Sequence, residues 1–236
     1  MGVSGGPYIV RDSSLVLELD AADRNSYVSG STIWRDLTAT NYTGSLVNGP
    51  VFSSGNQGSI VFDGTNDFVS IPVSMTLSNH TIISWVYFNS LNKDWIPILE
   101  FQSGSGGAYR AHYYVQGDLN PLQVRGFGAN WSTDGSGDNS NWTSTNLVTL
   151  QPNRWYMLTG RVDGNLGDTY INLEKSKTTK TISSYNNIGM TNILNSRPAV
   201  NLYNSGIVGS ILVYSKALSD SEILQNHNAL KSRFNL

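Results

Sequence analysis

The stretch Gly58–Pro72 reads GSIVFDGTNDFVSIP and contains the clearest strand–turn–strand pattern in the chain. β-Branched and aromatic residues dominate Ile60–Phe62 before a polar turn and Phe68–Ile71 after it, as is typical of strands. The turn supplies an Asp-Gly step and two carboxylates, Asp63 and Asp67, which can accept hydrogen bonds from turn N–H groups. We therefore predict a β-hairpin here, with the two carboxylates fixing its turn.

The composition around this stretch favours an all-β domain. The chain has 236 residues, of which 23 are Gly, only 14% are charged and 39% are hydrophobic. This mixture suits short strands joined by polar turns, and the length allows one large β-sandwich. Because no linker, fixed-period repeat or shift in composition divides the chain, we predict a single domain over residues 1–236. The Gly-rich residues 1–13 are expected to form a flexible N-terminal arm.

Charge and composition argue against several classes of function. The net charge is −2 and no dense run of Lys or Arg occurs, so we expect no nucleic-acid binding. The chain contains no Cys, which excludes disulfides and thiolate metal sites. No apolar run approaches the ~20 residues that span a bilayer, so no membrane insertion is expected. Residues 1–10 lack the basic and apolar regions of a signal peptide.

Apolar periodicity extends the strand pattern along the chain. Strands are predicted at 15–19, 32–37, 58–63, 68–72, 80–88, 95–101, 108–116, 122–129, 154–163, 169–174 and 206–214. Both faces of His80–Phe88 are apolar, which predicts a central strand covered on both sides. Leu15, Leu17 and Leu19 alternate and are predicted to share one face. The stretches 38–50, 130–146 and 175–205 are predicted to be turns and irregular segments.

The period changes near the C-terminus. Ser219 followed by Glu222 forms a capping-box pattern, and Leu218 with Ile223 can form a hydrophobic staple. Apolar residues then recur at helical spacing as far as Phe234. We therefore predict an amphipathic α-helix over residues 219–233 that closes the fold. The predicted fold class is all-β, with two antiparallel sheets and one C-terminal α-helix.

Four stretches, in this order, resemble the concanavalin A-like jelly roll of the laminin-G-like type. They are LVLELDA at 15–21, SIVFDGTNDFV at 59–69, NRWYMLT at 153–159 and VYSKALSDSEI at 213–223. The resemblance implies a two-sheet jelly-roll sandwich. Such modules bind glycans or proteins or serve as structural parts, and versions with this N-terminal stretch and closing helix occur in proteins of tailed phages and marine bacteria. One departure is Gly209-Ser210, which stands where the family often has an acidic pair.

The acidic residues do not form a convincing catalytic set. The run from Glu18 through Asp20 to Asp23 is similar to the Glu-x-Asp-x-x-Glu pattern of jelly-roll glucanases. Asp23, however, falls in a loop, and the resemblance places this run on the entering strand. The three histidines are too widely spaced to predict a zinc site or a catalytic triad. We therefore predict no catalytic residues and no enzymatic activity.

The candidate ligand site lies in and beside the loop 130–146. Aromatic faces and polar side chains of this kind bind sugars or proteins. The predicted contact residues are Trp131, Trp142, Asp134, Asp138, Asn139, Tyr113 and Tyr114. Asp134 and Asp138 have the alternating oxygens of a calcium site, and the alternative is that they only cap turns. For the loop tryptophans, the alternative is that one of them anchors the loop to the core.

These observations lead to a hypothesis of function. We predict a non-enzymatic, lectin-like structural module on the surface of a tailed-phage virion, either decorating the capsid or forming part of a fibre or appendage. Its expected partners are other virion or surface proteins, host glycans and, in a homo-oligomer, copies of itself. A carbohydrate-binding module of a bacterial surface or secreted protein and a glycoside hydrolase are the alternatives.

Overall fold

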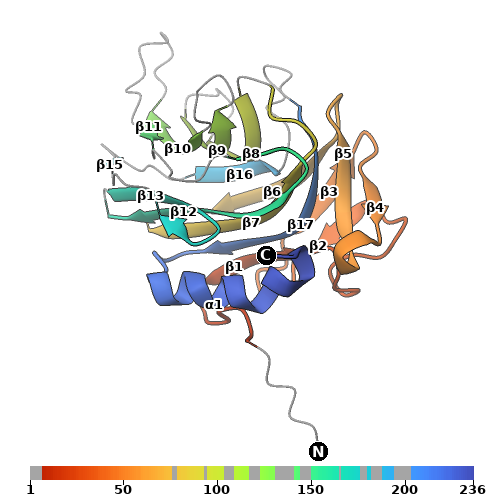
Figure 1. The fold of residues 1–236 in the computed structure, drawn as a ribbon, viewed down its shortest axis with the longest axis horizontal. Coiled ribbons are helices and arrows are strands. Elements are labelled where there is room, and N and C mark those ends of the chain that lie inside the picture. Colours follow the sequence, from red (N-terminus) through yellow and green to blue (C-terminus); the bar gives the residue numbers. More distant parts are fainter. Residues whose placement is uncertain are drawn as a thin grey trace, which may run out of the picture.

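A computed structural model describes residues 7–75, 79–92, 95–103, 109–116, 123–130, 141–143, 150–164, 166–175, 180–181, 188–193 and 203–236. These residues form two antiparallel β-sheets that pack face to face, with an α-helix on the outer side of one sheet (Figure 1). The predicted two-sheet sandwich with a C-terminal helix is therefore confirmed.

The first sheet carries the helix on its outer face. Its strand order is β14-β13-β12-β7-β17-β5-β4, while β1 also pairs with β17 and β15 with β13. Its strands are β1 (Leu15–Asp20), β4 (Val51–Ser53), β5 (Ser59–Asp63), β7 (His80–Phe88), β12 (Trp155–Asp163), β13 (Leu166–Ile171), β14 (Glu174–Lys175), β15 (Lys180–Thr181) and β17 (Ser205–Tyr214).

The second sheet packs on the opposite face of the first. Its strand order is β11-β10-β9-β8-β16-β6-β3-β2. Its strands are β2 (Ile33–Arg35), β3 (Thr43–Val47), β6 (Phe68–Met75), β8 (Trp95–Ser103), β9 (Tyr109–Gln116), β10 (Gln123–Asn130), β11 (Asn141–Thr143) and β16 (Ile188–Ile193). The register of β8 against β9 shifts between Pro97 and Leu99, which suits a proline because it has no N–H group to donate.

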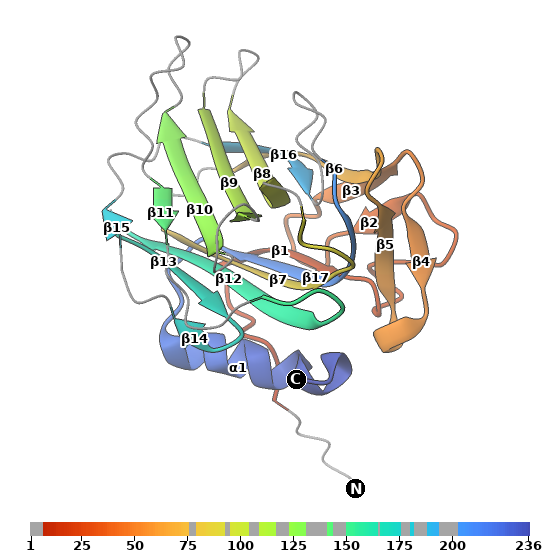
Figure 2. The ribbon, with the colours of Figure 1, turned by 45° about the horizontal axis from the view of Figure 1, so that its top comes forward.

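Strand β7 separates two hydrophobic clusters, as its apolar faces predict. Ile82 and Val86 lie in the core between the sheets, whereas Ile83 and Trp85 lie in the cluster beneath the helix. Figure 2 shows the helix α1 (Asp220–Leu230) running along the side of the first sheet that faces away from the second sheet. The molecule therefore has three layers, and the first sheet is the middle one.

The Gly58–Pro72 stretch forms two strands and a polar turn, but the prediction of a hairpin was wrong. Strand β5 pairs with β17 and β4 in the first sheet, whereas β6 pairs with β16 and β3 in the second. The turn therefore carries the chain from one sheet to the other. A paired hairpin and such a corner have the same apolar pattern, because that pattern reports burial and not the hydrogen-bonding partner.

The carboxylates of this corner act as turn caps, as expected. Asp63 Oδ1 accepts from the N–H of Thr65 at 2.7 Å, and Asp67 Oδ2 accepts from the N–H of Asp63 at 3.0 Å. Gly64 has φ +80°, and a Cβ there would lie 2.7 Å from the backbone nitrogen of Ser205. The corner therefore needs glycine both for its conformation and for its contact with the start of β17.

Strand β1 departs from the predicted alternation at one point. Leu17 and Leu19 lie in the core between the sheets, as predicted, but Leu15 lies in the cluster beneath the helix. The register of β1 against β17 shifts between Leu15 and Leu17. Such a bulge inserts one extra residue and turns the preceding side chain to the opposite face. The prediction that the three leucines share one face was therefore wrong for Leu15.

Four strands, β3, β11, β15 and β16, fall in stretches that the sequence predicted to be turns or irregular segments, and β4 lies in residues 51–57, for which no strand was predicted. Strand β16 is the most important, because it lies inside the second sheet between β8 and β6. Its sequence, IGMTNI, lacks a clear apolar alternation. Strands β3, β4, β11 and β15 are only two to five residues long. These strands form because neighbouring strands supply their backbone hydrogen bonds, which periodicity does not detect.

The C-terminal helix is shorter than predicted. Ser219 is its N-cap and forms the expected capping box with Glu222. The α-helix ends at Leu230, and a 3₁₀ helix, Lys231–Phe234, replaces the predicted last turn up to residue 233. This tighter turn brings Phe234 into the cluster beneath the helix, where the ring is 1% exposed. In the described part of the chain, no helix has the length and hydropathy needed to cross a bilayer.

Candidate functional site

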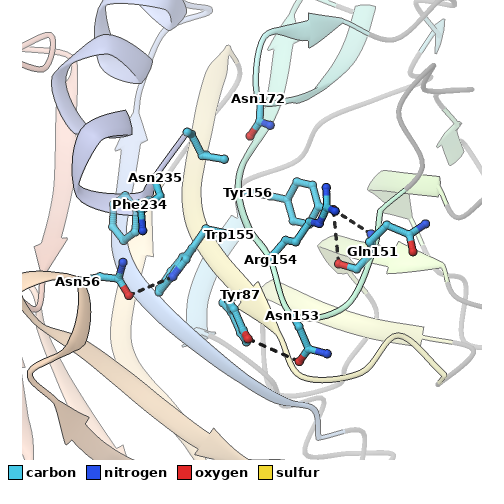
Figure 3. A pocket seen from close by; sticks show the side chains of 11 residues that line it. Asn56, Tyr87, Gln151, Asn153, Arg154, Trp155, Tyr156, Asn172, Phe234 and Asn235 are labelled. Atoms are coloured by element: carbon cyan, nitrogen blue, oxygen red, sulfur yellow. Dashed lines mark hydrogen bonds between the residues drawn. The ribbon is translucent and has the colours of Figure 1, made fainter.

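An open cavity of about 670 Å³ lies where the start of β12 meets the C-terminal segment. We call it the amide pocket, because five of its lining side chains are Asn or Gln (Figure 3). It is lined by Asn56, Tyr87, Gln151, Asn153, Arg154, Trp155, Tyr156, Asn172, Phe234, Asn235 and Leu236. Aromatic rings and amide groups thus meet in one concave site, which is the usual composition of a small-ligand site.

Packed aromatic rings form one wall of the pocket. The Trp155 ring centroid lies 4.6 Å from that of Phe234, and the Phe234 centroid lies 4.7 Å from that of the buried Trp85. Tyr87 also packs against Trp155 in a tilted arrangement, with 5.8 Å between ring centroids. Because Trp85 and Phe234 are buried under the helix, this wall is fixed in position by the hydrophobic cluster of the fold.

Asn56 connects Trp155 to the C-terminal segment through two hydrogen bonds. Its Oδ1 accepts from Trp155 Nε1 at 3.1 Å (Figure 3), and its Nδ2 donates to the Arg233 carbonyl at 2.9 Å. Indole N–H can only donate and a carbonyl can only accept, so the orientation of this amide is unambiguous. Asn56 therefore serves to build the pocket wall.

Other polar side chains at the pocket keep free donors. Asn172 Oδ1 accepts from the Met157 N–H at 2.9 Å, which leaves the Nδ2 amino group of Asn172 without a partner among the described residues. Asn153 Oδ1 accepts from the Tyr87 hydroxyl at 3.5 Å, a long contact. The side chains of Gln151 and Arg154 are exposed and make no hydrogen bond to the described part of the chain. They are available to a ligand.

The amide side chains share a backbone feature. Asn56, Asn153, Asn172 and Asn235 all have positive φ, between 54° and 60°. Asn enters this left-handed region more readily than most residues, so it is common in tight turns. Four turns from distant parts of the chain therefore present amides at the pocket. In the sequence, each of these residues is only an isolated Asn in a turn. Such a residue does not indicate that the four turns meet in the fold.

The sequence-based site lies largely outside the residues described. Trp131, Asp134, Asp138 and Asn139 fall outside them, so both the ligand-contact and the calcium predictions stay predictions at these positions. For Tyr113 and Tyr114 in β9 and Trp142 in β11, only the backbone is described. Within the described residues, no group of three His, Asp or Glu side chains could hold a metal ion.

Backbone pairing connects two parts of that predicted site. Gly126 in β10 pairs with Tyr113 of β9 on one side and with Trp142 of β11 on the other. The pairing with β11 also shows that part of the predicted loop 130–146 is a strand. The aromatic positions predicted from two separate stretches thus occupy one row at the end of the second sheet.

The glucanase-like run on β1 is held by arginines. Glu18 is 3% exposed and pairs with Arg11 at 2.5 Å, while Asp20 pairs with Arg233 at 2.7 Å. Asp23 accepts from the Asn25 N–H at 2.8 Å and only caps a turn. Glu18 and Asp20 line a smaller cavity of about 180 Å³ between the N-terminal segment and α1. The run therefore supports packing of the helix and does not reach the amide pocket.

The two described histidine side chains, His80 and His227, are buried. Burial lowers the pKa of His80 to about 4. The His227 ring packs against Trp85 with 5.8 Å between centroids, on the packed face of the helix. The side chain of His112 is outside the described set. Neither described histidine lines the amide pocket.

Glu18 leads to a pH-dependent prediction. Burial is the main cause that raises the pKa of Glu18 to about 7 from an ordinary value of 4.5, while the Arg11 charge opposes the rise. Because the folded chain keeps a proton that the unfolded chain releases, the Glu18 contribution to stability is fully present below pH 4.5. It is lost as the pH rises through about 7. We expect the stability of the wild type relative to Glu18→Gln to fall across this window.

Urea unfolding of both proteins at a series of pH values measures this difference. The lowered pKa of His80 acts in the opposite direction over part of the window, since its neutral form is favoured by burial. His80 is present in both proteins, so its effect cancels in the comparison. A stability difference that stays constant with pH would contradict the prediction.

Comparisons with known proteins place the chain in a family. A profile described as the concanavalin A-like lectin/glucanases superfamily matches residues 63–224, which is more than half of the chain. A search of curated protein sequences found no significant match.

Solved structures share the fold at low sequence identity. A sialidase from Trypanosoma rangeli has a TM-score of 0.64 at 16% identity, and the match covers 97% of this chain but 36% of that one. A structure titled HCR/D W1238A mutant has a TM-score of 0.67 at 12% identity, covering 91% of this chain and 50% of that one. The chain thus spans about a third to a half of the length of these two proteins.

A third structure is similar over almost its whole length. Domain 4 of AbnA, an extracellular arabinanase from Geobacillus stearothermophilus, in complex with arabinotriose, has a TM-score of 0.62 at 13% identity. The match covers 92% of this chain and 98% of that domain. At these identities the structural matches show the shared fold, and the profile match shows the family. The chain belongs to the concanavalin A-like lectin/glucanases superfamily.

Proposed function

We propose that this protein is a lectin-like module that binds an oligosaccharide in the amide pocket without cleaving it. The observation that carries the proposal is the meeting of ring faces and free amide and guanidinium donors in one open cavity. Sugars present C–H faces that pack on aromatic rings and hydroxyl groups that exchange hydrogen bonds with amides. The cavity volume of about 670 Å³ falls within the usual range for small-ligand sites.

The fold neighbours are consistent with this proposal. Domain 4 of AbnA carries arabinotriose in the structure that matches this chain. That ligand belongs to the other protein, and low identity limits the match to the fold. It nevertheless supports the view that a sandwich of this size and architecture can serve as a binding module attached to other domains.

The side chains at the pocket favour binding over hydrolysis. Glycoside hydrolysis requires a pair of carboxyl groups on either side of the bond that breaks. The described residues that line the amide pocket include no Asp or Glu side chain. The carboxylates Glu18 and Asp20 are paired with arginines under the N-terminal segment. We therefore propose a non-enzymatic role, to be tested by incubation with the bound glycan and analysis for cleavage products.

The biological setting in our proposal is the surface of a tailed-phage virion, with a bacterial surface or secreted protein as the alternative. This part rests on the sequence resemblance described above. A capsid decoration protein or appendage module would contact neighbouring virion proteins through the sandwich and leave the amide pocket open to glycans. Mass spectrometry of purified particles that failed to find the chain would remove the virion role and leave the glycan site standing.

Removing two exposed amides should weaken binding without unfolding the protein. We expect the double variant Gln151→Ala/Asn153→Gly to bind the glycan about ten-fold more weakly, because two ligand hydrogen bonds are lost. Glycine keeps the positive φ of Asn153, which is 60°, so the turn is preserved. Trp155 lines the pocket, so its fluorescence can report the titration once a glycan array has identified the ligand.

The matched control addresses the other candidate site. Trp131→Ala and Trp142→Ala remove the two tryptophans predicted from the sequence. If these changes abolish binding while Gln151→Ala/Asn153→Gly binds as tightly as the wild type, the amide pocket is not the glycan site. An array that shows no bound glycan would contradict the lectin-like function itself.

A further inference from the structure

We propose that the amide pocket selects acidic sugars, and that Arg154 recognises their carboxylate. The inference rests on the proposed function and adds the substrate class: oligosaccharides with a carboxylated residue, such as a uronic acid or a sialic acid. It follows from the hydrogen-bonding groups and the charged side chain of the pocket that have no partner within the described residues.

Hydrogen bonds within the protein engage the side-chain oxygens of two pocket amides, Asn56 and Asn172. Asn172 Oδ1 accepts from the Met157 N–H, and Asn56 Oδ1 accepts from Trp155 Nε1. Both donors are groups that can only donate, so neither amide can reverse its orientation without losing a hydrogen bond. The Tyr156 hydroxyl accepts from the Gln151 N–H at 2.8 Å and donates to the Gln151 carbonyl at 3.4 Å.

Donors remain after these bonds are made. The Nδ2 of Asn172 and the guanidinium of Arg154 have no partner among the described residues. The exposed side-chain amides of Gln151 and Asn235 each offer both donors and an acceptor, so the excess of donors comes from the guanidinium. A neutral sugar hydroxyl both donates and accepts, so it uses such a surface only in part. A carboxylate only accepts and has two oxygens, so it matches a surface rich in donors.

The charged side chain of the pocket also favours a carboxylate ligand. Arg154 is the one charged side chain among the described residues that line the cavity, and it makes no ion pair with the described part of the chain. An exposed guanidinium keeps its charge at all physiological pH values. It binds a carboxylate through two parallel N–H···O hydrogen bonds, which are stronger than bonds between neutral groups.

The rest of the pocket fixes the position of the sugar ring. Trp155 is 8% exposed, so only part of its ring reaches the cavity, beside Tyr87 and Tyr156. Arg154 and Trp155 are adjacent in sequence at the start of β12, where β7 pairs with Trp155 through Tyr87. Arg154 and the ring wall therefore lie side by side at one strand end, which suits recognition of a charged group close to an aromatic ring.

Matched acidic and neutral ligands test the proposal. The probes are an oligosaccharide with a terminal glucuronic acid and the same oligosaccharide after reduction of its carboxyl group to the alcohol, and a second pair with sialic acid and its methyl ester. We expect each acid to bind the wild type about ten-fold more tightly than its neutral partner. We also expect added salt to reduce that preference, because Arg154 is exposed to solvent.

Variants at two arginines assign the effect. We expect Arg154→Gln to bind the acid and the neutral sugar with similar affinities, and Arg154→Lys to recover part of the preference for the acid. Arg24→Gln removes an equally exposed charge that does not line the pocket and should leave the preference unchanged. Both changes are at the surface, so melting curves should match the wild type.

The possible outcomes distinguish the acidic-sugar inference from the proposed function. Equal binding of acid and neutral sugars by the wild type, or an acid preference that survives in Arg154→Gln, would overturn the acidic-sugar inference and leave the glycan site in place. Failure of all four probes together with an empty glycan array would contradict the proposed function itself. If Arg24→Gln lost the preference for the acid to the same extent, the preference would come from the overall charge of the protein. This result would also overturn the role of Arg154.

Discussion

Replacing Phe234 by alanine is expected to lower the free energy of unfolding by about 3–5 kcal/mol, the range for large buried aromatic residues. The Phe234 ring is 1% exposed and packs between Trp85 and Trp155. Its loss leaves a cavity under the helix and removes a wall of the amide pocket. We therefore expect weaker glycan binding as well as a lower midpoint of urea unfolding, which tryptophan fluorescence can follow.

A double-mutant cycle with Gly209 makes this prediction specific. A Cβ at Gly209 would lie 2.4 Å from two carbons of the Phe234 ring, so Gly209→Ala alone should destabilise the protein by about 1–3 kcal/mol through overpacking. In the Phe234→Ala background the ring is absent, and the same change should cost much less. Additive effects would show that the ring does not pack on Gly209. Leu224→Ala, on the exposed side of α1, serves as the control with a small effect.

Replacing Arg233 by alanine is the second change with a large expected effect. The guanidinium donates to Asp20 Oδ1 at 2.7 Å and to the carbonyls of Asn56, Gly58 and Gly209 at 2.7, 2.6 and 3.2 Å. Arg233 is 8% exposed, so its removal leaves buried carbonyls and a half-buried carboxylate without their donor. We expect a loss of about 3–5 kcal/mol, as for the breaking of a buried ion pair, measured by urea unfolding.

Two further variants serve as controls for Arg233. We expect Arg233→Lys to recover only a small part of the loss, because one ammonium group cannot reach acceptors on three separate segments. Arg24→Ala removes an arginine that is exposed, and its effect should stay within about 0.5 kcal/mol. An Arg233→Ala protein as stable as Arg24→Ala would contradict the role assigned to this hydrogen-bond network.

The two predictions together connect the stability of the fold with the candidate site. Phe234 and Arg233 belong to the 3₁₀ helix that follows α1, and each joins this segment to the first sheet. Asn56 then connects the same segment to Trp155. The amide pocket therefore exists only when the C-terminal segment is docked, so we expect a bound glycan to stabilise the whole sandwich through linkage.

The departure from the family pattern at Gly209-Ser210 has a structural explanation here. The sequence showed only that an acidic pair was missing at this position. In the structure, Gly209 lies where β17 changes its neighbour from β5 to β1, and its carbonyl accepts from both Ala21 and Arg233. A side chain at this point would occupy the space of the Phe234 ring. The glycine thus allows the helix segment to pack closely on the sheet.

The sequence by itself determined the local features of this protein. Apolar alternation placed the longer strands of the first sheet, and the capping box at Ser219 placed the start of the helix, because both signals depend on residues close together in the chain. The doubly buried strand β7 was predicted for the same reason. The four matched stretches also indicated the family, which the profile match then established.

Only the tertiary structure decided which strands pair and which turns meet. The Gly58–Pro72 stretch has the local pattern of a hairpin, yet its two strands belong to different sheets, since long-range partners supply their hydrogen bonds. Likewise, Asn56, Asn153, Asn172 and Asn235 are ordinary turn residues until the fold brings them around Trp155. Burial pattern is encoded locally, whereas pairing and pocket formation depend on contacts between residues far apart in the chain, such as Asn56 and Arg233 with a separation of 177.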